Sequence, residues 1–107
     1  QVATDGDWLQ LRDELVERVG RFRSSGVIID VGQLDIMDSF ATRILHTIAE
    51  ECRLRGAETV IVGIRPEVAF SMVQLGWTAR LAGIGTALDL EDGLARLERR
   101  KTEDERP

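Results

Sequence analysis

Apolar residues in the first quarter of the chain recur at steps of three and four. They are Trp8, Leu11, Leu15, Val19 and Phe22. This spacing predicts an amphipathic helix with one apolar face. We expect Asp5 or Asp7 to cap the start of the helix, and the serines and glycine at 24–26 to end it.

Two short runs of β-branched residues interrupt the helical spacing. Residues 27–31 and 59–62 are continuous apolar stretches apart from Asp30 and Thr59, as expected of strands covered on both faces. Between them, helical spacing returns from about Ser39 to Arg55, and Gly56 ends that helix. Residues 32–38 then form the loop that leads from the first strand into this helix.

The second half of the chain repeats the alternation of strand and helix. Pro66 suits the first turn of a third helix, which ends near Gly76 and Trp77. Thr86 and Ala87 indicate a brief third strand, and leucines at 90, 94 and 97 mark a last helix. From Glu98 onward the chain is almost wholly charged, so we expect a solvated and frayed end.

The alternation predicts an α/β fold, with a mostly parallel or mixed sheet packed against helices. Two or three strands are too few for a stable sheet. We therefore expect that strands belonging before Gln1 complete the sheet, or that another chain supplies an edge. The domain organisation predicted is one N-terminally incomplete domain over residues 1–100 and a charged tail over residues 101–107.

Composition narrows the classes of function. The 107 residues carry 14 basic and 19 acidic side chains, a formal charge of -5, which disfavours binding to a nucleic-acid backbone. Lys101 is the only lysine, and Cys52, the only cysteine, is expected in the core. No apolar run approaches a membrane span and no secretory signal is visible, so we expect a cytoplasmic protein that binds no membrane.

Three aspartates follow the first predicted strand, where open α/β sheets place their ligands. Asp30, Asp35 and Asp38 can be read as Mg²⁺ ligands for phosphoryl transfer, or as turn and helix-cap residues. An aspartate that accepts a phosphoryl group also needs a lysine from a later strand, and the fold offers none. The turn and cap interpretation is therefore favoured, and no metal site is expected.

Ser39 stands at the start of the second helix, where free N–H groups and the helix dipole favour an anion. A phosphate there would add about -1.5 to -2 charges beside Asp35 and Asp38, whereas the simplest interpretation is a neutral helix cap. His46 and Cys52 are too far along the same helix to form a nucleophile and base with Ser39. Phosphate-binding glycine loops are also missing, so we expect no enzyme and no cofactor.

Arg65 follows the second predicted strand. Since parallel strands bring their carboxyl ends to one edge, the Arg65–Pro66 turn is expected beside the Ser39 loop, and a solvated arginine is the equally weighted alternative.

Three stretches of the chain resemble the STAS domain, the fold of bacterial anti-sigma-factor antagonists, and within it the small stressosome proteins of the RsbS type. They read GVIIDVGQLDIMDSF, RGAETVIVGIRPEVAFSMVQLG and TALDLEDGLARL. The resemblance implies a mixed sheet whose first strand pair lies before Gln1. It also implies a phosphorylated hydroxyl at Ser39, with Ser71 as a weaker second candidate.

The resemblance implies a function as well. An unmodified protein of this kind forms a homo-oligomer or assembles with an RsbR-like STAS co-scaffold into a large hetero-oligomeric stressosome, and it sequesters an RsbT-like serine/threonine kinase. Phosphorylation then releases the kinase, and an RsbX-like phosphatase resets the site. We expect Asp35, Asp38, Arg65 and Glu67 to form the partner surface. The alternatives are a Mg²⁺-dependent phosphoryl-transfer domain and a STAS module that binds a nucleotide or lipid.

Overall fold

The computed structural model describes residues 3–35, 37–81 and 83–104, and it contains helices and strands in alternation. In chain order they are α1 (Asp5–Phe22), β1 (Gly26–Asp30), α2 (Ser39–Leu54), β2 (Glu58–Val62), α3 (Pro66–Gln74), the 3₁₀ helix η1 (Trp77–Leu81), β3 (Gly85–Ala87) and α4 (Leu90–Asp104). The α/β fold class predicted from the sequence is confirmed.

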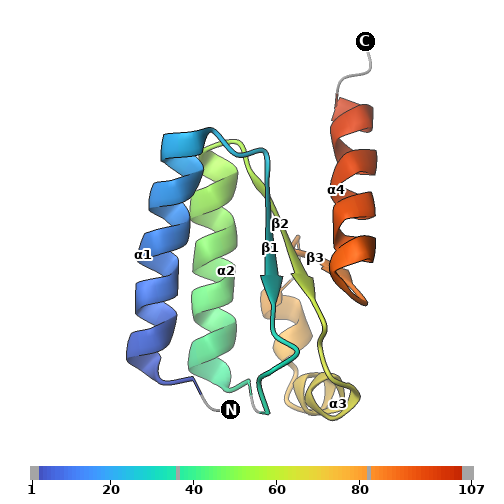
Figure 1. The fold of residues 1–107 in the computed structure, drawn as a ribbon. Coiled ribbons are helices and arrows are strands. Elements are labelled where there is room, and N and C mark those ends of the chain that lie inside the picture. The colour runs from blue at the N-terminus through green and yellow to red at the C-terminus, as the bar shows by residue number, and fades with distance from the viewer. Residues whose placement is uncertain (1–2, 36, 82, 105–107) are drawn as a thin grey trace.

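The described strands form one parallel sheet in the order β1-β2-β3. Ile29 of β1 lies opposite Ile61 of β2, and Ile61 lies opposite Thr86 of β3. Figure 1 shows α1 and α2 side by side on one side of the sheet and α4 on the other, with α3 near the carboxyl ends of the strands. Within the described residues, β1 and β3 are the two edges; strands before Gln1 stay a prediction.

The core lies between the sheet and the α1–α2 layer. Leu45, Ile48 and Cys52 on one face of α2 are fully buried, and Ile61 of β2 is buried in the same cluster. Helix α4 packs closely against the opposite face of the sheet. A Cβ on Gly93 would lie 2.9 Å from Cγ1 of Val62, so the missing side chain lets the helix approach the strand.

Both ends of α1 differ from the sequence prediction. The N-cap is Thr4, not Asp5 or Asp7: its hydroxyl accepts from the Asp7 N–H (3.1 Å), and Asp7 Oδ2 accepts from the Thr4 N–H (2.9 Å). This reciprocal capping box satisfies two helix-end donors at once. At the other end Arg23, rather than a glycine, adopts the left-handed conformation, with φ 52°.

Two further differences concern the second half of the chain. After α3 the backbone forms η1 from Trp77 to Leu81, and buried Leu81 anchors it to the core. The segment from Glu98 to Asp104 is helical, where the sequence predicted a frayed end, although the side chains of residues 98–103 are exposed as expected. The Asp89 carboxylate accepts from the Asp92 N–H (2.9 Å) and starts this helix.

Candidate functional site

Two loops meet at the carboxyl edge of the sheet. The loop between β1 and α2 carries Asp35, and the turn between β2 and α3 carries Arg65. Arg65 Nη1 donates to Asp35 Oδ1 at 2.6 Å. Both side chains are exposed, 43% for Arg65 and 54% for Asp35. The ion pair therefore lies on the surface, and the expected proximity of the Arg65 turn to the loop that leads to Ser39 is confirmed.

A glycine contact brings the two loops together. Gly63, directly after β2, has φ +76°, and a Cβ there would lie 2.9 Å from Asp30 Oδ1 and 3.3 Å from the Gly32 Cα. Only a residue without a side chain fits this combination of left-handed backbone and close approach. The backbone of one loop thus packs directly on the other.

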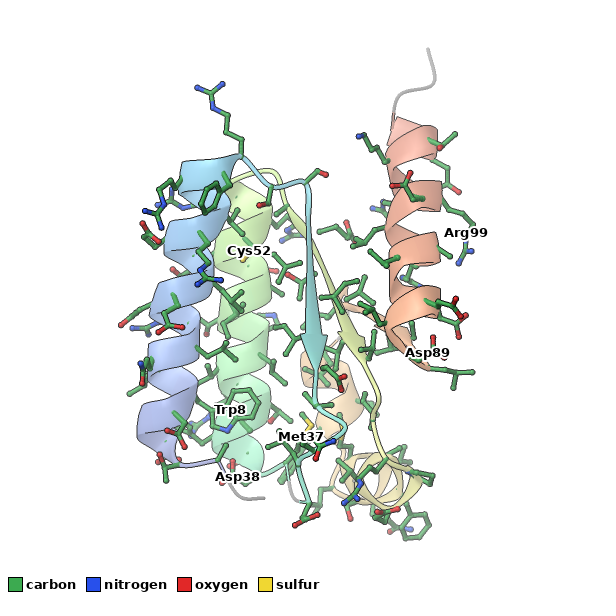
Figure 2. The ribbon with its side chains drawn as sticks, in the orientation of Figure 1. Trp8, Met37, Asp38, Cys52, Asp89 and Arg99 are labelled. Atoms are coloured by element: carbon green, nitrogen blue, oxygen red, sulfur yellow. The ribbon has the colours of Figure 1, made fainter. Side chains whose placement is uncertain are left out.

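Ser39 is the first residue of α2 and is half-buried. Asp38 is the N-cap, and its Oδ1 accepts from the Ala41 N–H at 2.8 Å. Thr42, fully buried, donates from Oγ1 to the Ser39 carbonyl at 3.0 Å. Figure 2 shows Asp38 and Met37 at the same end of the molecule, where α2 begins. The backbone around Ser39 is thereby held from both sides.

The three aspartates have separate tasks. Asp30 Oδ1 accepts from the Gly32 N–H (2.8 Å), Asp35 pairs with Arg65, and Asp38 caps α2. Within the ranges that the structure describes, no group of three histidine, cysteine or acidic side chains is placed to hold a metal ion. The partners of the three carboxylates agree with the turn and cap interpretation.

The remaining candidate residues lie away from this edge of the sheet or at its border, on α3. His46 is exposed on α2, and Cys52 is buried in the core, where burial raises the pKa of its thiol. On α3, Ser71 Oγ donates to the Glu67 carbonyl (3.1 Å), and Glu67 Oε1 lies 4.0 Å from Arg65 Nε. Ser71 and Glu67 are both exposed.

The sequence reasoning missed two residues that position the site, Thr42 and Met37. Thr42 follows Asp38 by four residues, a spacing at which a threonine hydroxyl bonds back to the preceding turn, so its role was readable. Met37 is 3% exposed and packs in the core cluster. Met37 belongs to a loop with neither helical nor strand periodicity, so the sequence carries no such signal, and only the folded packing brings this side chain against the core.

Among the described residues, no helix has both the length and the apolar content needed to span a bilayer.

Comparisons with known proteins add the following. The model of the family described as STAS domain matches residues 8–92. RsbT co-antagonist protein RsbRA of Bacillus subtilis strain 168 is 31% identical in an alignment of 91 residues that covers 78% of this chain. RsbRD of the same organism is 30% identical over 64 residues, 60% of this chain. The chain spans only about a third of RsbRA (33%) and less of RsbRD (23%).

Two solved structures are similar over most of their length. A serine-to-glutamate variant of Moorella thermoacetica RsbS is 32% identical with a TM-score of 0.77, covering 95% of this chain and 86% of that one. A chain from a structure described as the molecular architecture of the stressosome, a signal integration and transduction hub, is 34% identical with a TM-score of 0.70. That match covers 88% of this chain and 80% of the other.

Proposed function

This chain belongs to the STAS-domain family, and from that premise we propose that it is a non-enzymatic stressosome scaffold and phospho-switch of the RsbS type. In its unmodified form it assembles in the cytoplasm with an RsbR-like STAS co-scaffold and holds an RsbT-like serine/threonine kinase. Phosphorylation of Ser39 releases the kinase, and an RsbX-like phosphatase restores the holding form.

The relatives support the scaffold part of this proposal. Two are described as co-antagonists of RsbT, and two structural relatives are RsbS and a component of a stressosome. The match to RsbS extends over 86% of that chain, whereas the match to RsbRA covers 33% of its length. Both kinds of relative support a STAS scaffold of the stressosome.

The position of Ser39 is the observation that carries the switch part. It is the first residue of α2, next to a capping aspartate and at the same edge as the Arg65–Asp35 ion pair. Ser71, the weaker candidate, lies in the second half of α3, and its hydroxyl is bonded within that helix. Phosphorylation of Ser39 would place the new charge among the groups proposed as the partner surface.

We expect the phosphate to act through charge and not through refolding. A dianion at the first turn of a helix is favoured by the helix dipole and the free N–H groups, so α2 keeps its conformation. The carboxylates of Asp35 and Asp38 are its like-charged neighbours. Adding about -1.5 to -2 charges there raises the cost of burying the surface against a docked kinase.

Mass spectrometry after reaction with kinase tests the proposal. The full-length protein is incubated with an RsbT-like kinase, an RsbR-like partner and ATP, alongside Ser39→Ala and the matched control Ser71→Ala. We expect one phosphate on Ser39 in wild type and Ser71→Ala, none in Ser39→Ala, and dissociation of the kinase as phosphate accumulates. A complex that forms without phosphate, or a phosphate on another residue, contradicts the switch.

A further inference from the structure

Arg43 lies one helical turn after Ser39 on α2. Residues four apart on a helix are neighbours on its surface, with Cβ atoms about 5–6 Å apart. Helical side chains are also tilted toward the N-terminus of their helix, so the long side chain of Arg43 extends toward the turn that begins with Ser39. Arg43 is exposed, and Ser39 is half-buried.

The guanidinium of Arg43 lies against an aromatic ring. Its Cζ is 6.0 Å from the centroid of the Phe40 ring, at the outer limit of the range over which a cation and a ring attract each other. Phe40 is partly buried and packs against the core. Within the part of the chain that the structure describes, no carboxylate forms an ion pair with Arg43, in contrast to Arg53 and Arg65. The guanidinium therefore has only a loose contact to give up.

We propose that Arg43 binds a phosphate carried by Ser39, and that phosphorylation moves its guanidinium from the Phe40 ring to the phosphate. This inference rests on the proposed function, since it takes Ser39 as the modified residue. An acidic group four residues before a basic one is the favourable order for such a pair on a helix. A guanidinium also matches two phosphate oxygens with parallel N–H bonds, and hydrogen bonds between charged groups are about twice as strong as neutral ones.

The pair changes the surface of the switch in two ways. It holds the phosphate along the first turn of α2, where the backbone is already fixed by the Asp38 cap and the Thr42 hydroxyl. It also removes the guanidinium from the Phe40 ring, so the phosphorylated protein presents an uncovered aromatic side chain next to Ser39. The modified surface then differs in apolar contact as well as in charge, with no rearrangement of the helix.

The ionisation of the phosphate tests the pair. Phosphoserine is incorporated at position 39 of the full chain during protein synthesis, and its phosphorus resonance is followed by NMR from about pH 5 to 8 at low salt. Wild type is compared with Arg43→Gln, Arg43→Lys and the control Arg53→Gln, which removes an arginine from the last turn of the same helix. His46, which follows Arg43 on α2, is common to all four proteins.

A guanidinium beside the phosphate favours the dianion and lowers the pKa of its second ionisation. We expect Arg43→Gln to raise this pKa by about 0.3 and Arg43→Lys, which keeps the charge, to raise it less. Arg53→Gln should leave it unchanged. An unchanged pKa in Arg43→Gln, or an equal rise in Arg53→Gln, overturns the proposal.

The Nε–H proton of Arg43 gives a second measurement. Its resonance should move downfield when Ser39 carries phosphate, as expected of a proton donated to a phosphate oxygen, and that of Arg53 should stay in place. An Arg43 resonance that stays at its unmodified position would contradict the move. Neither measurement uses a kinase, so failure here leaves the switch proposal untouched, and failure of the kinase to modify Ser39 is detected separately by mass spectrometry.

Discussion

At the scale of single residues, two side chains fix the start of α2. The Asp38 carboxylate accepts from the Ala41 N–H, and the Thr42 hydroxyl bonds back to the Ser39 carbonyl. A cap and a buried hydroxyl act on the same turn, so the backbone that presents Ser39 is set before any partner binds. The dual use of Asp38, as cap and as charged neighbour of Ser39, can be separated by substitution.

Replacing Asp38 by alanine should destabilise the protein. The Ala41 N–H loses its acceptor, a change that typically costs about 0.5–2 kcal/mol, while Asp38→Asn keeps an acceptor and should cost less. Urea unfolding followed by circular dichroism measures both. Equal losses for the two variants would show that the carboxylate charge, and not the cap, stabilises this turn.

The buried thiol of Cys52 should make stability depend on pH above about 8.5. Burial raises the pKa of Cys52 in the folded protein. As pH rises past the ordinary thiol pKa, the unfolded chain releases this proton while the folded chain retains it, so the free energy of unfolding falls.

Urea unfolding at pH values between about 7 and 10 checks this against Cys52→Ala, which lacks the thiol. Every other titratable group is common to both proteins. The wild-type free energy should decline more steeply than that of the variant. Parallel pH profiles would refute the assignment of the effect to Cys52.

At the scale of elements, α4 depends on a missing side chain. Gly93 faces Val62, which is 1% exposed, and a Cβ would lie 2.9 Å from its Cγ1. Glycine lowers the intrinsic helix propensity of α4. The close packing of helix on sheet therefore outweighs a locally unfavourable residue.

Gly93→Ala should destabilise the protein even though alanine is the better helix former. Overpacking a core costs about 1–3 kcal/mol, against at most about 1 kcal/mol gained in propensity. Gly6→Ala in α1 is the matched control, because its Cβ would meet only Thr4 Oγ1 at an ordinary 3.7 Å. We expect a lower melting temperature for the first variant and an equal or higher one for the second; a stabilised Gly93→Ala would contradict the packing argument.

The order of the helices and strands could be predicted from the sequence, because the spacing of apolar residues indicates which face of each element is buried. The strands around Ile29 and Ile61 and the helix after Asp38 follow from that spacing alone. The Thr4 cap was missed because two aspartates at 5 and 7 offered the same chemistry, and only the backbone decides between them. The sequence could place the Arg65 turn beside the loop that leads to Ser39, at one edge of the sheet. It could not show that Arg65 pairs with Asp35, because this depends on how the two loops pack at Gly63.

At the scale of the whole molecule, acidic side chains gather at the end where three of the helices start. Figure 1 shows α1, α2 and α4 starting at the end where the strands have their carboxyl ends. Acidic residues gather at these helix starts: Asp5, Asp7, Asp38, Asp89, Glu91 and Asp92. The last turns carry Arg21, Arg53 and Lys101, and the last turns of α2 and α4 also contain Glu51 and Glu103. The acidic starts are favourable to the helix dipoles and leave the end that bears Ser39 acidic.

An acidic end implies that the effect of a charge added at Ser39 is sensitive to salt. If repulsion and desolvation release the kinase, Ser39→Glu should weaken kinase binding more at low ionic strength than at high. Exposed charges are screened over about 10 Å at 0.1 M salt and about 3 Å at 1 M. We expect the ratio of dissociation constants, Ser39→Glu over wild type, to fall about threefold or more across that range.

Calorimetric titration of the kinase at the two salt concentrations gives this ratio, and Ser71→Glu on α3 provides the same charge away from the start of α2. The control should show a smaller ratio at low salt, because Ser71 lies in the second half of α3 and not in the first turn of α2, where Asp38 is the cap. Backbone amide chemical shifts of α2 supply the independent reading. The proposal would be contradicted by a ratio of dissociation constants that does not change with salt, together with changed amide chemical shifts throughout α2. The added charge would then act by rearranging the helix and not by changing the electrostatic field at its surface.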